Sequence, residues 1–143
     1  MNKGLFSSMT AEWETPQDLF DRLNALFDFE LDVCATPENA KCARFYTKED
    51  DAIVQPWAKR NWMNPPYGKE IAAFCAKASE MGGGGALTVA LLPARTDTQW
   101  FHDYCTPWHI QFLRGRLKFR NQDGKTGSAP FPSIIVYFGI PRG

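Results

Sequence analysis

The segment Asn64-Pro65-Pro66-Tyr67 holds the residues whose types and order are best suited to chemistry. Asn64 offers an amide oxygen, Pro65 a carbonyl oxygen and Tyr67 an aromatic face, and this set suits a planar amine. The ring of Pro66 fixes its own φ and restricts Pro65 to an extended conformation, so that both oxygens are held in one direction. The segment is therefore predicted to bind an exocyclic amine. The alternative is a proline turn followed by a buried tyrosine.

The surrounding elements place this segment where a ligand site is expected. Arg60–Met63 is predicted to be a short strand, the two prolines enforce a loop, and a helix is predicted from Lys69 to Met81. The alternating residues Phe29–Cys34 predict another strand, which carries the acidic Asp32 close to its carboxyl end. Two predicted strands thus end in residues that are able to contact a ligand.

Helices and apolar strands alternate along the rest of the chain. One helix is predicted from Thr15, as its capping residue, with Pro16 in the first turn, to Phe27, and another follows a capping box at Thr96–Gln99. The run Gly82–Gly85 is interpreted as a helix stop and linker, because a phosphate-binding loop follows a strand and opens a helix. Further strands are predicted at 86–92, 109–113, 116–119 and 133–138, and irregular structure at 36–58 with a short strand near 43–46.

This alternation predicts an α/β fold with a mostly parallel sheet and helices on both faces. The last two strands, at 116–119 and 133–138, are expected to form an antiparallel pair. Ligands of such sheets bind beyond the carboxyl ends of the strands, which gives candidate sites at 32–36, 64–67 and 93–95.

The composition indicates a globular protein, with 44% hydrophobic and 22% charged residues in 143. We expect a single domain over residues 1–143, with a loose arm at 1–11. No stretch is apolar enough to span a bilayer, and no secretory signal opens the chain, so an intracellular, soluble protein without a membrane partner is expected. The four cysteines form no C-x-x-C pair and there are two histidines, which predicts reduced thiols and no metal site.

Charge is unevenly distributed, although the net charge is zero. Residues 12–51 carry eleven Asp and Glu against four Lys and Arg, whereas residues 52–143 carry eleven Lys and Arg against five Asp and Glu. An acidic first part and a basic second part suggest two different ligands, one cationic or hydroxyl-bearing and one anionic. The alternative is random variation of surface charge.

The order Asn-Pro-Pro-Tyr resembles the motif of S-adenosylmethionine-dependent amino-methyltransferases, and the whole chain resembles one family in particular. That family is the compact Dam-like DNA N6-adenine methyltransferases typical of phages and prophages. The resemblance covers nearly the whole chain and rests on residues 13–16, 31–40, 64–67, 92–97, 112–119 and 129–133.

The resemblance implies a compact Rossmann-like methyltransferase fold and transfer of a methyl group from S-adenosylmethionine to the exocyclic amine of a flipped adenine in DNA. It also implies a phage- or prophage-encoded protein in the cytoplasm of a bacterial host, with protection of DNA from restriction as its purpose.

The same resemblance implies which residues contact the cofactor. Thr15 and Pro16 would border its methionine end, Asp32 with Cys34 and Ala35 would form the main cofactor loop, and Asp51 would face its adenine. One departure is that the turn after the first strand lacks the glycine-rich G-x-G of many methyltransferases, so close backbone approach to the cofactor is less assured.

The chemistry of the target amine explains the motif. Asn64 and Pro65 would accept its N–H bonds and stabilise the positive charge that develops on nitrogen during attack. A duplex adenine must leave the stack, and Tyr67 would then stack on it, with Phe119 or Phe131 on the other face. The last two are equally interpreted as core residues, and Trp57 and Trp62 as packing residues.

A DNA contact is expected in the basic second part. Arg114, Arg116, Lys118 and Arg120 alternate and would share one strand face suited to phosphates, with Lys125 beyond them. A solvated strand face is the alternative. Two other functions stay open, namely methylation of protein glutamine or an RNA base, and a non-catalytic nucleic-acid-binding module of the same fold.

Overall fold

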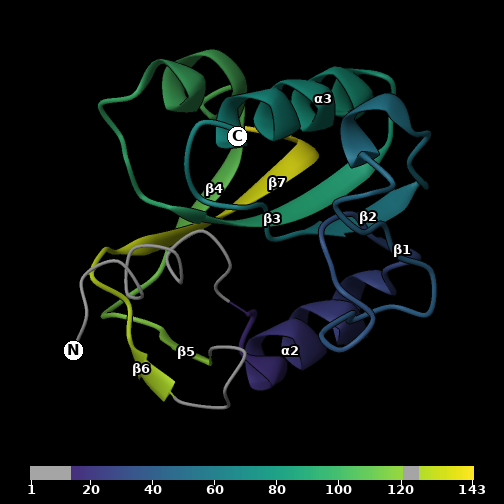
Figure 1. The fold of residues 1–143 in the computed structure, drawn as a ribbon. Coiled ribbons are helices and arrows are strands. Elements are labelled where there is room, and N and C mark those ends of the chain that lie inside the picture. The colour runs from purple at the N-terminus through teal and green to yellow at the C-terminus, as the bar shows by residue number, and fades with distance from the viewer. Residues whose placement is uncertain (1–13, 121–125) are drawn as a thin grey trace.

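The computed structural model describes residues 14–120 and 126–143 (Figure 1). The arm expected at 1–11 and the basic residue Lys125 lie outside these ranges. In chain order the elements are α2 (Gln17–Phe27), β1 (Leu31–Asp32), the 3₁₀ turn η1 (Ala52–Val54), β2 (Arg60–Met63), α3 (Ile71–Gly83), β3 (Leu87–Pro93), the π-helical turn η2 (Phe101–Cys105), β4 (Trp108–Phe112), β5 (Lys118–Arg120), β6 (Thr126–Ser128) and β7 (Ser133–Pro141).

Five strands form one mixed sheet in the order β1-β2-β3-β7-β4. β1, β2 and β3 are parallel, and β7 is antiparallel both to β3 and to β4. Of these five strands only β7 is therefore reversed. The α/β class is confirmed, and the sheet that was predicted to be mostly parallel is a mixed one, parallel in two of its four neighbouring pairs. The carboxyl ends of β1, β2 and β3, at Asp32, Met63 and Pro93, consequently lie along one edge of the sheet.

The antiparallel pair predicted between the last two strands is wrong. The segment predicted at 116–119 forms β5, which pairs with β6 in a separate two-stranded sheet. β7 pairs instead with β3 and β4. Its residues from Ser133 to Phe138 are all buried, so this strand needs a neighbour on each side and cover on both faces, whereas the charged β5 does not suit a sheet interior.

Helices α2 and α3 cover opposite faces of the sheet, as predicted (Figure 1). Phe27 of α2 contacts Tyr137 of β7, with 5.8 Å between ring centroids. Gly82 of α3 lies against the backbone of Phe138 and Gly139, where a Cβ atom on Gly82 would come within 2.8 Å of the Gly139 nitrogen.

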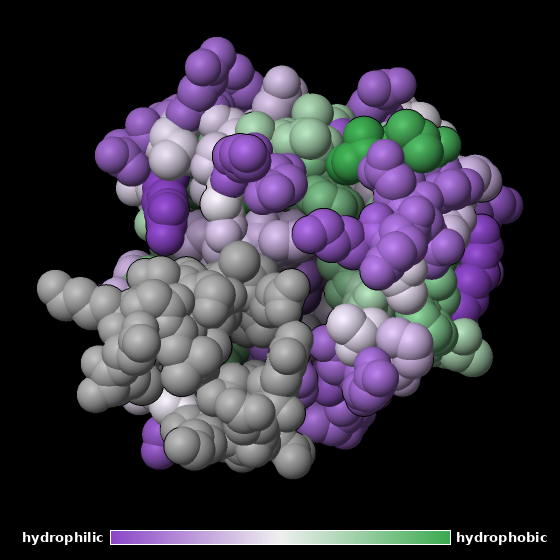
Figure 2. All heavy atoms as spheres, in the orientation of Figure 1, coloured by the Kyte–Doolittle hydropathy of each residue, from purple (hydrophilic) through white to green (hydrophobic). Residues whose placement is uncertain are grey.

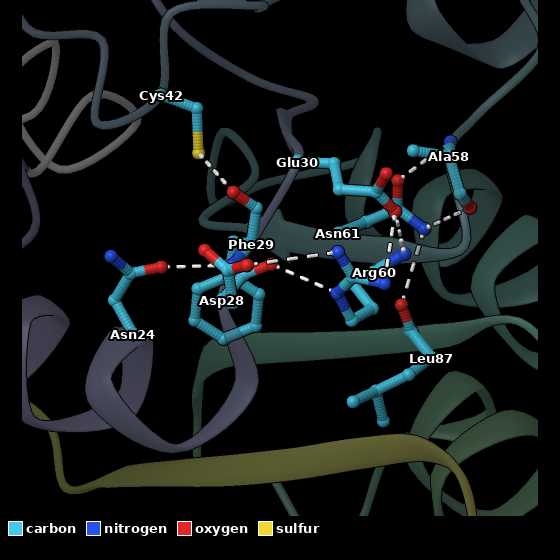
Figure 3. Close-up of polar contacts among 9 residues, drawn as sticks. All are labelled: Asn24, Asp28, Phe29, Glu30, Cys42, Ala58, Arg60, Asn61 and Leu87. Carbon is cyan, nitrogen blue, oxygen red and sulfur yellow. Dashed lines mark hydrogen bonds and ion pairs between the residues drawn. The ribbon is translucent and has the colours of Figure 1, made fainter.

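The junction between α2 and the amino ends of β1 and β2 is a network of polar contacts (Figure 3). Asp28 ends α2 with a positive φ of 54°, and its carbonyl oxygen accepts a hydrogen bond from Arg60 Nε at 2.9 Å. Glu30 lies 3.7 Å from the same guanidinium. The Asn61 carboxamide is satisfied at both ends, accepting from Ala58 N and donating to carbonyl oxygens that include that of Leu87. These contacts fix where the parallel strands begin.

The segment between β1 and β2 is mostly irregular, as predicted, with short turns and the 3₁₀ turn η1. Instead of the strand expected at 43–46, a single parallel bridge joins Asp32 to Phe45. Asp32 N donates to the Arg44 oxygen at 3.1 Å, and Tyr46 N donates to the Asp32 oxygen at 2.9 Å. The bridge gives the outer edge of β1 a partner beside the last residue of that strand.

α3 ends at Gly83, two residues later than predicted, so Gly82 and Gly83 belong to the helix, and Gly84 and Gly85 form the helix stop and linker that lead to β3 at Leu87. The capping residue of the next helical turn differs from the prediction. Phe101 N donates to the Thr98 hydroxyl at 3.3 Å, so Thr98 rather than Thr96 is the cap.

Hydrophilic residues predominate on the face shown in Figure 2, with a small hydrophobic group at the upper right. The large apolar side chains that are exposed in the described ranges are Leu26, Val54, Phe112 and Ile140. None of the helices described is both long and apolar enough to cross a membrane.

Candidate active site

Asp32, the last residue of β1, organises the loop that follows it. Its Oδ1 accepts a hydrogen bond from Cys34 N at 3.2 Å, and its Oδ2 accepts one from Lys41 N at 3.0 Å. Burial raises the pKa of the Asp32 carboxyl to about 6, although the two backbone hydrogen bonds act to lower it. The segment 33–41 contains no glycine, and the carboxylate holds its two ends together instead.

Thr15 does not cap α2 as predicted. The helix begins at Gln17, and Pro16 before it provides no side-chain cap. The buried Thr15 hydroxyl instead accepts hydrogen bonds from Trp62 Nε1 at 3.3 Å and from Asn64 Nδ2 at 3.0 Å. The residue predicted to start the helix therefore joins it to the carboxyl end of β2.

Tyr67 closes the Asn64–Tyr67 loop and is packed into the protein, with 7% of its surface exposed. Its hydroxyl donates to the Leu91 carbonyl oxygen at 3.3 Å, and burial raises the pKa of the phenol above its ordinary value. The ring meets Phe131 edge-on, with centroids 5.3 Å apart, and Phe131 in turn lies 6.3 Å from the fully buried Phe119. Phe119 is thus a core residue, and Trp57 and Trp62 are buried as expected.

A cavity of about 790 Å³ opens beside the carboxyl ends of β1 and β2. This volume is in the range of sites that hold a small organic ligand. Seven predicted site residues line it: Thr15, Asp32, Cys34, Ala35, Asp51, Asn64 and Pro66. Pro16, Pro65 and Tyr67, which neighbour these residues in sequence, are not part of the lining.

The lining of the cavity is acidic. Two basic side chains, Lys41 and Lys48, face six acidic ones: Glu14, Asp32, Glu38, Glu49, Asp51 and Glu70. An excess of carboxylates attracts a cation and repels a phosphate, so the cavity suits a positively charged ligand or one with hydroxyl donors. Most of these carboxylates come from the acidic first part of the chain, so the cavity is a candidate site for the cationic ligand that was inferred from it.

One wall of the cavity is formed by Asp51 and η1, and a residue that sequence reasoning missed holds it in place. Lys77 of α3 donates hydrogen bonds to the carbonyl oxygens of Ala52 and Ile53, at 2.9 Å each, and to that of Gln55. Its ammonium group also lies 5.2 Å from the centre of the Trp57 ring. No motif or spacing in the sequence marks this lysine, because its partners are backbone oxygens about 25 residues away.

The predicted basic face is only partly formed. Lys118 and Arg120 belong to β5, but Arg114 and Arg116 precede it, separated by Gly115 with a φ of 74°. The expectation of one continuous strand face from Arg114 to Arg120 is therefore wrong, because a turn interrupts it. Arg116 instead donates to the Ala129 carbonyl oxygen at 3.4 Å, close to the β5–β6 pair.

The four cysteines are thiols, Cys75 and Cys105 buried and Cys34 and Cys42 partly so. Within residues 14–120 and 126–143 no three His, Cys, Asp or Glu side chains are grouped as a metal site. Cys34 reaches the cavity, and burial raises its pKa well above the ordinary value, so this thiol stays protonated.

Comparison with known proteins gives two curated relatives. The "DNA N-6-adenine-methyltransferase" of Escherichia phage T1 is 34% identical over 92 residues, which are 62% of this chain and 38% of that protein. "Putative methyltransferase YfdM" of Escherichia coli (strain K12) is 41% identical over 64 residues, 39% of this chain and 70% of that protein. The match thus spans well under half the length of the phage relative.

The sequence model described as DNA N-6-adenine-methyltransferase (Dam) matches residues 5–139, which is nearly the whole chain. The matched range includes the loop after β1, the Asn64–Tyr67 segment and the strands that carry them. The chain therefore belongs to the Dam family of DNA N-6-adenine-methyltransferases.

Proposed function

We propose that this chain, as a single domain, transfers a methyl group from S-adenosylmethionine to the N6 amine of adenine in DNA. The observation that carries the proposal is that Asn64 and Pro66 open on the same acidic cavity as Asp32, Cys34 and Asp51. A site for a cationic ligand and one acceptor for an amine, Asn64, are thereby neighbours at one edge of the sheet. The arrangement of β1 to β3 around this edge favours a shortened Rossmann-like methyltransferase fold.

The cavity suits S-adenosylmethionine by the charge of its lining and by its volume. The cofactor supplies an electrophilic methyl group on a sulfonium centre. Asp32 would attract this cationic ligand, while the loop that it holds, with Cys34 and Ala35, would line the cavity beside it. Asp51 would accept hydrogen bonds from the cofactor, and Thr15, which also lines the cavity, would lie beside it, whereas Pro16 is not part of the lining.

The target amine would be held by Asn64 and Pro65. Both oxygens accept N–H bonds, and they stabilise the positive charge that grows on nitrogen as it attacks, because acceptor dipoles fixed in advance need no reorganisation. Pro66 keeps Pro65 extended. Because Tyr67 is buried, anchored through its hydroxyl to Leu91 and not part of the cavity lining, its ring would hold the Asn64–Tyr67 loop in place.

DNA would be bound by the basic residues of the second part. Lys118 and Arg120 belong to β5 and Arg114 and Arg116 precede it, while Lys125 follows in the sequence outside the described residues. The adenine would have to leave the duplex stack to reach the cavity edge. The likeness to a phage T1 protein favours phage DNA in a bacterial cytoplasm as the setting, with protection from restriction as the purpose.

Nucleotide mass spectrometry of DNA from cells that express the chain tests the proposal. N6-methyladenine should appear with the wild-type chain and fall at least tenfold with Asn64→Ala, because that change removes one acceptor of the target amine. Purified protein is then given labelled S-adenosylmethionine with DNA, RNA or protein. If the labelled methyl group appears only in RNA or only in protein, the substrate is not DNA. If calorimetry shows that the chain binds DNA but not S-adenosylmethionine, the chain is a non-catalytic nucleic-acid-binding module.

A further inference from the structure

Thr15 is bonded at two points to the end of the strand that carries the amine-binding loop. It is 7% exposed, and its hydroxyl oxygen accepts from Trp62 Nε1 at 3.3 Å and from Asn64 Nδ2 at 3.0 Å. An indole nitrogen can only donate, so Trp62 commits one lone pair of the hydroxyl, and the Asn64 amide occupies the other. The two lone pairs of this one oxygen are thereby both in use.

In the structure this contact places the donor end of the Asn64 carboxamide against Thr15. A carboxamide has a donor end and an acceptor end of nearly equal shape, and a half-turn about the last side-chain bond exchanges them. The amine site needs the acceptor. Because Nδ2 is bonded to Thr15, Oδ1 is directed to the opposite side of the carboxamide.

The anchor behind Thr15 is rigid. Trp62 is fully buried and packs against Phe20 at 5.5 Å and Phe29 at 5.7 Å between ring centroids. Its indole N–H therefore holds a fixed position in the core, and the Thr15 hydroxyl is held against it. The orientation of Asn64 is thus set from the hydrophobic core through one hydroxyl group.

We propose that Thr15 is a positioning residue, which orients the Asn64 carboxamide so that its oxygen accepts the target amine. The proposal rests on the proposed function and adds a residue to it that acts through Asn64. It differs from the role that the family resemblance implies for Thr15, which is contact with the cofactor. The two roles are separable, because a cofactor contact changes affinity for S-adenosylmethionine, whereas a positioning residue changes turnover.

Kinetics of Thr15→Val and Thr15→Ser test the proposal. Valine keeps the shape of threonine and removes the hydroxyl, so we expect kcat to fall about tenfold with the dissociation constant of S-adenosylmethionine changed less than about twofold. Serine keeps the hydroxyl and should restore kcat to within about threefold of wild type. A Thr15→Val variant that binds the cofactor at least tenfold more weakly and keeps its kcat would overturn the positioning role.

A double-mutant cycle shows whether Thr15 acts through Asn64. If it does, Thr15→Val in the Asn64→Ala background lowers kcat no further, because the group to be oriented is gone. Losses that multiply would mean that Thr15 acts independently of Asn64, against the proposal. Thermal unfolding of each variant identifies any loss of activity caused by unfolding.

A readout without catalysis keeps this inference separate from the proposed function. In the ¹⁵N–¹H correlation spectrum, the side-chain NH₂ signal of Asn64 is identified by its loss in Asn64→Ala. We expect Thr15→Val to shift this signal and speed its exchange with water, and Thr15→Ser to leave it near its wild-type position. An unshifted signal in Thr15→Val refutes the orienting bond, whereas an inactive wild-type chain with the expected shifts refutes only the proposed function.

Discussion

Lys77 of α3 donates a hydrogen bond of 2.9 Å to the carbonyl oxygen of Ala52, and so ties a helix on one face of the sheet to the wall of the cavity. The same ammonium group holds the carbonyl oxygens of Ile53 and Gln55, and Asp51 precedes these residues with a φ of 56°. A single cation thus closes the turn in which Asp51 reaches the cavity.

Replacing Lys77 should weaken both the fold and the cavity. We expect Lys77→Met to lower the free energy of unfolding by about 1–3 kcal/mol, the usual value of hydrogen bonds made by a charged group, and to weaken S-adenosylmethionine binding severalfold. Urea denaturation and calorimetry measure the two effects. The exposed Lys69, just before the same helix, provides the matched control Lys69→Met, and equal effects of the two changes would contradict this role.

The buried Asp32 should make stability depend on pH in an unusual direction. Its pKa is raised from 3.8 to about 6 in the folded chain, so the folded state binds the proton more tightly than the unfolded state does. The resulting stabilisation is fully present below about pH 4 and is lost as the pH rises through about 6, by up to about 3 kcal/mol. Asp32→Asn does not titrate, so urea denaturation from pH 4 to 7 should show the wild type losing stability relative to this variant.

Ligand binding should show the opposite trend with pH. A cationic ligand favours the ionised carboxylate, so affinity for S-adenosylmethionine should rise as the pH increases through about 6 and then level off. Calorimetry at several pH values measures this, and in Asp32→Asn the rise should be absent. A wild-type affinity that stays constant from pH 5 to 7 would separate Asp32 from the ligand.

Lys118 is the clearest test of the basic strand as a DNA contact, since Arg116 also bonds to the Ala129 carbonyl and would change the fold if replaced. Lys118→Glu should weaken DNA binding and make the logarithmic salt slope smaller by about one, because one phosphate contact is lost. Fluorescence anisotropy over a salt series measures both. Lys59→Glu is the charge-matched control, because Lys59 is exposed and precedes β2, at the sheet edge opposite the cavity.

The hydroxyl group of Ser133 is expected to lower the free energy of unfolding. It is 1% exposed at the start of β7, and within the described part of the chain its hydroxyl has no hydrogen-bond partner. Removal of a buried unsatisfied hydroxyl is favourable, so Ser133→Ala should raise the free energy of unfolding by about 1 kcal/mol.

Ser79 gives the contrasting control for this experiment, because its hydroxyl accepts the Trp108 indole N–H at 2.9 Å. Ser79→Ala should therefore lower the free energy of unfolding while Ser133→Ala raises it, as measured by urea denaturation. A loss of stability in Ser133→Ala would mean that its hydroxyl is satisfied in solution.

Local rules predicted the parts of the site that depend on neighbouring residues. The proline pair marks the loop at 64–67, and the alternation before Asp32 marks its strand, because both signals lie within a few residues. Thr15 satisfies the local rule for a helix cap and yet bonds to Trp62 and Asn64, 47 and 49 residues away. A tertiary contact of that kind leaves no trace in the spacing of residues.

The prediction of strand pairing was wrong for a similar reason. Alternation in β5 and burial in β7 identify both as strands, but they do not say which strand is the neighbour of which. The apolar character of β7 on both faces does indicate a central strand, and this is where the structure places it. Lys77 and Gly82 were missed because their partners are backbone atoms, which every residue has.

The approach of Gly82 to Gly139 limits how far the site can change in size. With no side chain on Gly82, the backbones of α3 and β7 touch, and a methyl group on Gly82 would push the helix outward. Phe74 lies on the same helix, about 12 Å nearer its start, and lines the cavity. An outward shift of α3 at Gly82 would therefore also move Phe74. The width of a ligand-binding space is thus fixed by two residues that never contact the ligand.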